Sequence, residues 1–258
     1  VHQYTVAGSY VDRREAISGF AALQDSTTAV EMLKTALRDR YLELRIFALH
    51  SADLTKEHVK QALESTIFIV AKGDPEPTVR AEALMALSLY DKPIYKELIQ
   101  RSVNDSSYSV AGAALLSLNQ LDKPEAYAKA KKLTATKTKG KLAEAISNVF
   151  AENSKAEDLD YVLHWYNALP FGQAKVENAN IVAYYAIQLQ NTEAVKKATD
   201  ALVLLRDQIP AAYREDIYPF VNNVLLKTIA TQKTAMKNMA ADAAAIQEQV
   251  DYINSQIK

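Results

Sequence analysis

One phrase is written twice in this chain, and that repetition limits the fold more than any other feature. Residues 74–84 read DPEPTVRAEAL, and residues 105–115 read DSSYSVAGAAL. Each copy continues through an apolar stretch to the same exit, Asp-Lys-Pro, at residues 91–93 and 122–124. The phrase and its exit therefore recur after the same interval of 31 residues. A fixed period of about 20 to 50 residues is typical of stacked supersecondary units, so the repetition predicts a helical-hairpin solenoid.

The repeat extends in both directions when its small-residue core is followed. That core is an Ala followed by Ile or Leu, and it occurs at Ala16-Ile17, Ala48-Leu49, Ala83-Leu84, Ala114-Leu115 and Ala145-Ile146. An Arg stands three residues before the Ala in the first three copies, and the last two copies lack it. This arrangement, with an Asp before the Arg, is similar to the HEAT family of helical repeats, in which the Arg or its Asp partner braces neighbouring repeats. The resemblance implies a structural, repeat-bracing role for Arg13, Arg45, Arg80, Asp39, Asp74 and Asp105.

Each copy is expected to form two antiparallel helices, because one such pair cannot bury its apolar faces alone. The first helices should begin near Thr28, Thr55, Pro93 and Pro124, with Glu31 completing a capping box in the first. The second helices should begin after the three repeat Asp residues, whose side chains can cap free N–H groups. The core Ala residues should be small because two helices cross closely there.

The register of the repeat ends near Asn153. Helices are still predicted over residues 157–169, 173–190, 192–208 and 211–218, and another from Pro219 onward. We therefore expect repeats over residues 1–153 and an irregular helical continuation over residues 154–258 that caps the stack, packed as one domain. The chain has only six glycines and seven prolines, and Val and Ile do not alternate as in a strand. The predicted fold class is all-α, a right-handed α–α superhelix of HEAT-like or armadillo type with an irregular C-terminal cap.

The C-terminal segment carries apolar residues at alternating spacings of three and four. They are Met236, Met239, Ala243, Ile246, Val250, Ile253 and Ile257. Such a seam is typical of a dimeric coiled coil. It is also typical of a final helix packed along its neighbour, which the small Ala and the flexible Met residues favour. Both alternatives stay open.

Composition excludes several classes of function. With 30 basic and 31 acidic residues, the chain lacks the basic excess of a general nucleic-acid binder. The lysines of the segment 129–141 (Lys129, Lys131, Lys132, Lys137, Lys139 and Lys141) have no aromatic residues between them, which favours a solvated helix end and loop over a phosphate site. No apolar run approaches the roughly 20 residues that span a bilayer. The absence of Cys excludes disulfides, thiol catalysis and Cys-ligated zinc.

No catalytic constellation is present. None of His2, His50, His58 and His164 is followed by Glu, so the H-E-x-x-H zinc motif is missing. There is no G-x-S-x-G and no glycine-rich phosphate loop, and the carboxylates are spread as on solvated helix faces. We expect no catalytic residue, cofactor or metal ligand in this chain.

The opening residues 10–17, YVDRREAI, followed by the HEAT-like copies, resemble the C-terminal helical domain of bacterial zinc aminopeptidases of the aminopeptidase N (gluzincin) family. The resemblance covers residues 10–150. It implies a fragment whose partner is a preceding catalytic domain of the same polypeptide. The zinc and the Gly-Ala-Met-Glu-Asn motif would belong to that domain, since neither has a counterpart here. A chain that begins at Val1 without Met fits such an excision.

What the resemblance implies is a non-catalytic domain that caps the active-site chamber and restricts or orients peptide substrates. It also favours an extracytoplasmic, periplasmic location, with which the absence of Cys is compatible. The alternative is a free-standing HEAT-repeat scaffold that binds another protein along its concave surface. That alternative predicts exposed aromatic or Arg residues on the inner helices of successive repeats. Residues 46–47 and 81–82 show no repeated binding signature. An independent enzyme is the third and least favoured interpretation.

Overall fold

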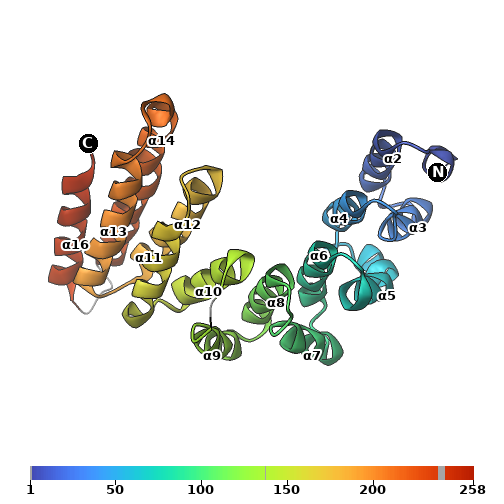
Figure 1. Ribbon diagram of the computed structural model, residues 1–258, viewed down its shortest axis with the longest axis horizontal. Coiled ribbons are helices and arrows are strands. Elements are labelled where there is room, and N and C mark those ends of the chain that lie inside the picture. Colours follow the sequence, from blue (N-terminus) through green and yellow to red (C-terminus); the bar gives the residue numbers. More distant parts are fainter. Residues whose placement is uncertain (1, 137, 238–241) are drawn as a thin grey trace. The chain divides into compact units, whose positions relative to one another are not determined.

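The computed structural model describes residues 2–136, 138–237 and 242–258, and within these ranges all regular structure is helical (Figure 1). The predicted all-α fold class, a HEAT-like helical-repeat solenoid, is confirmed. The chain divides into two compact units, unit 1 at Val1–Ala145 and unit 2 at Ile146–Lys258. The sequence-based division at residue 153 concerns where the repeat register ends, and it stays a prediction.

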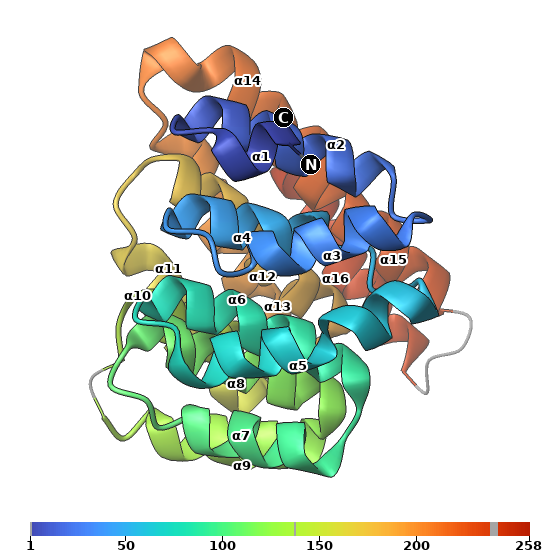
Figure 2. The same cartoon turned by 90° about the vertical axis from the view of Figure 1, so that its right-hand side faces the viewer.

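Unit 1 is built from helices that alternate between two layers. They are α1 (His2–Val6), α2 (Tyr10–Ala22), α3 (Thr27–Ala36), α4 (Leu42–Ser51), α5 (Glu57–Gly73), α6 (Pro77–Leu87), the 3₁₀ turn η1 (Ser88–Tyr90), α7 (Pro93–Ser102), α8 (Tyr108–Leu121) and α9 (Lys123–Leu133). The helix α10 (Gly140–Asn153) begins in unit 1 and ends in unit 2. In Figure 2, α3 lies beside α4 and α5 beside α6, as their contacts require. The second helices α2, α4, α6 and α8 each contact the next, which makes one continuous layer.

The helix starts follow local capping chemistry rather than the repeat alone. The helix α7 begins at Pro93, as predicted. The helix α9 begins one residue before the expected Pro124, because Asp122 serves as N-cap and accepts a 3.0 Å hydrogen bond from the Glu125 N–H. The capping box predicted at Thr28 is not formed, since Ser26 is the N-cap and makes no side-chain cap. The helix α5 begins at Glu57 instead of residue 55.

Small residues allow the second helices of unit 1 to pack closely. The core residues Ala48, Ala83 and Ala114 are fully buried. Gly112 of α8 is tighter still, because a Cβ atom there would lie 2.5 Å from the backbone oxygen of Lys141 at the start of α10. The alanines that the sequence marked as close-packing positions are therefore in the core. At Gly112 the backbone of α8 packs directly against the backbone at the start of α10.

Unit 2 contains longer helices without the repeat register. They are η2 (Ala156–Asp158), α11 (Leu159–Ala168), α12 (Gln173–Gln188), α13 (Thr192–Asp207), η3 (Ala211–Tyr213), α14 (Arg214–Pro219), the π-helical segment η4 (Phe220–Leu226), α15 (Lys227–Lys237) and α16 (Ala243–Gln256). The aromatic side chains of Tyr166 and Tyr185 are fully buried in this unit. The helix α12 packs against α11, α13 and α15.

The C-terminal seam runs over two helices instead of one. The helix α15 ends at Lys237 and α16 begins at Ala243, with Asp242 as N-cap, while Met239 lies outside the described residues. In α16 the side chains of Ile246, Val250 and Ile253 are buried, and the helix packs against α13 and α15. These apolar residues therefore pack against neighbouring helices of unit 2, as expected for a final helix packed along its neighbour.

Candidate functional site

The six residues expected to brace the repeats all lie in unit 1 and form three pairs between successive repeats. The nitrogen–oxygen distances are 2.5 Å for Arg13–Asp39, 2.8 Å for Arg45–Asp74 and 4.0 Å for Arg80–Asp105. Each Arg therefore reaches the Asp that precedes the next second helix. The sequence analysis named these six residues without pairing them, and the pairing comes from the structure.

The same arginines also bind backward to their own repeat. Nη1 of Arg45 donates to the Asp39 carbonyl oxygen at 2.8 Å, and Nη1 of Arg80 donates to the Asp74 carbonyl oxygen at 2.8 Å. Each of these guanidinium groups thus joins the backbone of one repeat to the carboxylate of the next. We call the continuous series from Arg13 to Asp105 the Arg–Asp ladder.

The Asp residues of the ladder organise the helix starts, though not as the N-caps that the sequence suggested. The N-caps of α4, α6 and α8 are Tyr41, Glu76 and Ser107. Each Asp instead accepts the N–H of that N-cap residue, two positions along, at 3.0, 3.0 and 2.8 Å. This is an Asx turn, which leads the chain into the helix.

The first pair of the ladder is the most strongly held. The Tyr4 hydroxyl donates to Asp39 at 2.6 Å, beside the two bonds from Arg13. Burial opposes ionisation of Asp39, but hydrogen bonds from Arg13, Tyr4 and the Tyr41 N–H outweigh it and hold its pKa below the usual value. Burial, followed by the contact with Asp39, raises the pKa of Tyr4. These side chains are engaged with one another, which leaves the ladder little capacity to bind a ligand. That it braces the repeats stays a prediction, tested below.

A second set of residues faces outward from the second helices of unit 1. We define the second-helix face as Arg14 on α2, Phe47 and His50 on α4, and Glu82 and Met85 on α6. The Arg14 guanidinium lies 4.9 Å from the centre of the Phe47 ring, and His50 Nε2 lies 2.8 Å from Glu82 Oε2. Met85 is 41% exposed. The face is therefore continuous over three successive helices and combines charged, aromatic and apolar groups.

Sequence reasoning missed this face because it searched for identical residues at identical positions. Phe47 and Glu82 stand one residue before the core Ala of their helices, and His50 and Met85 stand two residues after it. At the same positions of the later copies Ala113 and Ser147 are buried, so neither the residue types nor the exposure repeat. Spacing from the core Ala therefore does not mark these residues as one face, and the contact between Arg14 and Phe47 is seen only in the structure.

Other candidate groups show no organised site. In the described part of the chain no cluster of three or more His, Asp or Glu side chains could hold a metal ion. His58 is already bound, with Nε2 2.7 Å from the Gln24 carbonyl oxygen. In the Lys-rich segment Lys129 pairs with Glu125 and Lys141 with Glu144, while Lys137 lies outside the described residues. None of the helices described is both long and apolar enough to cross a membrane.

Comparison with known proteins identifies the repeats. The sequence model of the HEAT repeat family matches residues 64–149, about a third of the chain. Among solved structures, the chain is similar to one from the complex of CpcE and CpcF of phycocyanin lyase from Nostoc sp. PCC7120. The identity is 14%, the alignment covers 88% of this chain and 94% of that chain, and the TM-score is 0.41. No curated protein sequence matches.

The resemblance to the aminopeptidase N family is wrong. The match over residues 64–149 is to HEAT repeats as such, and no curated peptidase sequence matches the chain. The physical reason lies in the features that suggested it. Arg13 and the Ala residues that follow it are explained by the Arg–Asp ladder and by close helix packing, which carry no information about a neighbouring enzyme. A preceding catalytic domain, its zinc and the fragment interpretation therefore have no support.

Proposed function

We propose that this protein is a HEAT-repeat scaffold that binds another protein through the second-helix face of unit 1. The observation that carries the proposal is the continuity of that face over α2, α4 and α6, with contacts from Arg14 to Phe47 and from His50 to Glu82. Stacked repeats are suited to this role because their aligned helices create extended binding surfaces.

The chemistry of the face supports a protein partner. Arg, aromatic and Met side chains are enriched where proteins bind one another, and Arg14, Phe47 and Met85 supply one of each. Neighbouring helices lie about 8 to 10 Å apart, so three of them present roughly 20 Å of surface, enough for one helix or an extended segment. Contacts such as Arg13–Asp39 and Arg45–Asp74 support the proposal, because helices held in place before binding lose less entropy on association.

The test uses the purified whole chain as bait and asks which protein co-purifies in a fixed stoichiometry. Phe47→Ala and Met85→Ala should each weaken that complex by about tenfold or more. The matched control is Ile69→Ala, because Ile69 is also an exposed apolar residue of unit 1 but lies on the first helix α5. A complex that survives both face variants, or that is lost equally in the control, would contradict the proposal.

A further inference from the structure

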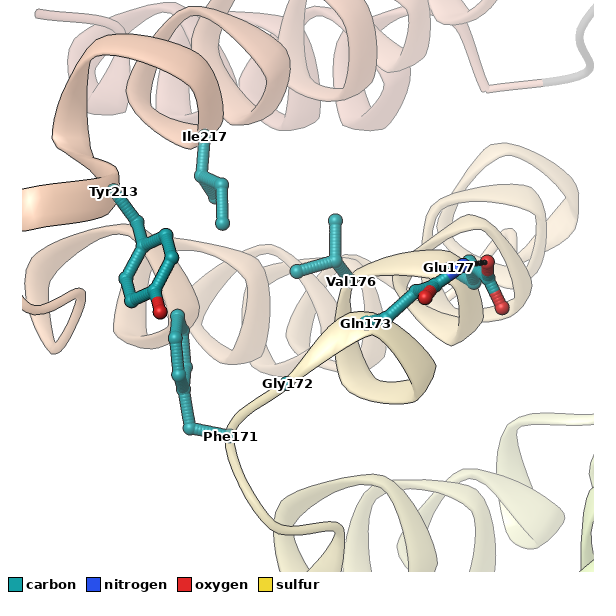
Figure 3. A pocket seen from close by; sticks show the side chains of 7 residues that line it. All are labelled: Phe171, Gly172, Gln173, Val176, Glu177, Tyr213 and Ile217. Carbon is teal, nitrogen blue, oxygen red and sulfur yellow. Dashed lines mark hydrogen bonds between the residues drawn. The ribbon is translucent and has the colours of Figure 1, made fainter.

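Unit 2 contains an apolar pocket that the proposed function does not use. Its volume is about 390 Å³, and it lies between the start of α12 and the consecutive helices η3 and α14 (Figure 3). Its apolar walls are Phe171, Val176, Tyr213 and Ile217, and Gly172, Gln173 and Glu177 complete the lining. In Figure 3 the Phe171 and Tyr213 side chains approach each other from the two segments, with Val176 and Ile217 between α12 and α14.

The two aromatic rings are unusually exposed for residues that meet. Phe171 is 41% exposed and Tyr213 is 53% exposed, and their ring centres lie 5.9 Å apart at an angle of 48°. A single exposed aromatic side chain needs no explanation. Here two of them come from separate segments and line one concavity, and concave, largely apolar surfaces are where ligands and peptide side chains bind. The pocket volume lies at the small end of the range of about 300 to 1,000 Å³ for binding pockets. That volume suits one large apolar side chain.

The charges near the pocket are mainly acidic. Glu177 lies in the lining, and its carboxylate accepts a 2.7 Å hydrogen bond from Gln173 Nε2. Glu215 and Asp216 lie in the first turn of α14, in the sequence between the pocket residues Tyr213 and Ile217. Both are exposed.

Two cations also belong to these segments. Arg214 is exposed at the start of α14. Lys175 is already bound, since its Nζ donates to the carbonyl oxygens of Asn167 and Leu169 at 3.2 and 3.1 Å, near the end of α11. Bonds to neutral carbonyl oxygens leave Lys175 its positive charge, so three carboxylates stand against two cations here. The excess is one negative charge, and Glu177 is the charged residue that lines the pocket itself, so a basic partner is favoured.

We propose that this pocket docks a segment of a partner protein in which one large apolar side chain is flanked by Lys or Arg. The apolar side chain would enter between Phe171, Val176, Tyr213 and Ile217, and the flanking cation would lie near Glu177 and the α14 carboxylates. Burial of the anchor supplies the affinity, and the acidic surroundings select the charge of its neighbours. This site stands independently of the second-helix face, because its residues all belong to unit 2.

The experiment measures binding of short fluorescein-labelled peptides to the whole chain by fluorescence anisotropy. The probe peptide carries one Phe or Leu between Lys and Arg residues. Two matched peptides replace the cations by Glu or the apolar anchor by Ser. Only the probe peptide should bind, and its addition should shift the NMR signals of the Tyr213 ring.

Variants of the pocket separate the two contributions. Tyr213→Ala and Phe171→Ala should each weaken the probe peptide about tenfold. Glu177→Gln, which removes the charge and keeps the shape, should weaken it about threefold and lessen its dependence on salt. Val224→Ala is the control, since Val224 is 51% exposed in the same unit but lies on η4 and does not line the pocket. The substituted side chains are exposed or half-exposed, so equal thermal midpoints should show that the fold is kept.

Three results would overturn this proposal. The first is equal binding of the Glu-substituted peptide, which would remove the role of charge. The second is unchanged affinity in the Tyr213→Ala and Phe171→Ala variants, which would place the peptide elsewhere. The third is that no peptide binds at concentrations up to about 1 mM. An apolar dye that binds the wild-type protein but not Tyr213→Ala would show that the pocket is open in the same sample, so that the failure lies with the peptide. None of these results bears on the partner of unit 1, whose test uses different residues.

Discussion

Arg45 shows at the scale of one residue how the repeats are joined. Its guanidinium binds the Asp39 carbonyl oxygen on one side and the Asp74 carboxylate on the other, and both it and Asp39 are buried. The equivalent Arg80 lies 4.0 Å from Asp105, and both side chains are partly exposed. Because removal of one partner strands a buried charge but only slightly affects an exposed one, the two arginines should contribute unequally.

Replacing Arg45 by Met should therefore lower the free energy of unfolding by about 3 to 5 kcal/mol. Arg80→Met should lower it by about 1 kcal/mol or less. Urea unfolding measures both losses, and a double-mutant cycle with Asp74→Ala isolates the pairwise energy of Arg45. Equal losses for the two variants would show that the ladder does not brace the repeats as its burial suggests.

Lys233 presents the opposite case, a buried cation that donates to a neutral backbone carbonyl. It is 1% exposed, and its Nζ donates to the Leu189 carbonyl oxygen at the end of α12. Burial lowers the pKa of Lys233 to about 8, from 10.5. In the unfolded chain the amine keeps its proton up to the higher value. The folded state therefore binds fewer protons between pH 8 and 10.5, and stability rises with pH in that window.

The wild-type protein should accordingly gain stability, relative to Lys233→Met, by about 2 kcal/mol between pH 7 and pH 10. Unfolding in urea at both pH values measures this gain, because other titrating groups cancel in the difference between the two proteins. Lys227→Met is the control, as Lys227 is exposed on the same helix. A wild-type to Lys233→Met difference that is independent of pH would contradict the prediction.

At the scale of the helix, sequence patterns located the elements well and their boundaries less well. The apolar periodicity and the Ala positions marked the helices of unit 1 from α2 onward, because both report directly on burial, but they did not predict α1. The start of α5 and the break between α15 and α16 were missed, since they depend on local hydrogen bonds such as the cap of Asp242 to the Ala245 N–H. Apolar residues spaced three and four apart are expected both in one continuous helix and in two consecutive helices, so the spacing could not reveal the break.

Gly112 and Gly19 offer a matched test of helix packing. Both lie inside helices, where Ala is intrinsically better by about 1 kcal/mol. A Cβ at Gly112 would lie 2.5 Å from the Lys141 oxygen, while nothing lies within 4 Å of one at Gly19. Gly112→Ala should therefore destabilise the protein by about 1 to 3 kcal/mol, because backbone has to move. Gly19→Ala should stabilise it by up to about 1 kcal/mol. Thermal and urea unfolding of the two variants decide the point, and a gain in both would mean that α8 and α10 are not in close contact.

At the scale of the whole chain, the repeat predicted the fold but could not supply the function. Arg13, Arg45 and Arg80 each reach an Asp of the next repeat, so their pattern reports on how repeats contact one another and on no particular neighbouring domain. The outward-facing Phe47 and Met85 are free of that requirement, and nothing in their spacing distinguishes them from other surface residues. The pocket of unit 2 was also beyond sequence reasoning, since Phe171 and Tyr213 come from segments without a shared pattern.

The division into two units makes a prediction about how the chain unfolds. Repeat stacks lose cooperativity over long distances, because each unit is stabilised by its nearest neighbours. Trp165 is the single tryptophan and lies on α11 in unit 2, so its fluorescence reports on that unit alone.

Arg45→Met in unit 1 should lower the urea midpoint seen by circular dichroism more than the midpoint seen by Trp165 fluorescence. Leu202→Ala, which empties a fully buried position of α13, should lower the fluorescence midpoint strongly, since such truncations cost about 2 to 5 kcal/mol. If Arg45→Met shifts both midpoints equally, the shared helix α10 couples the units into one cooperative structure.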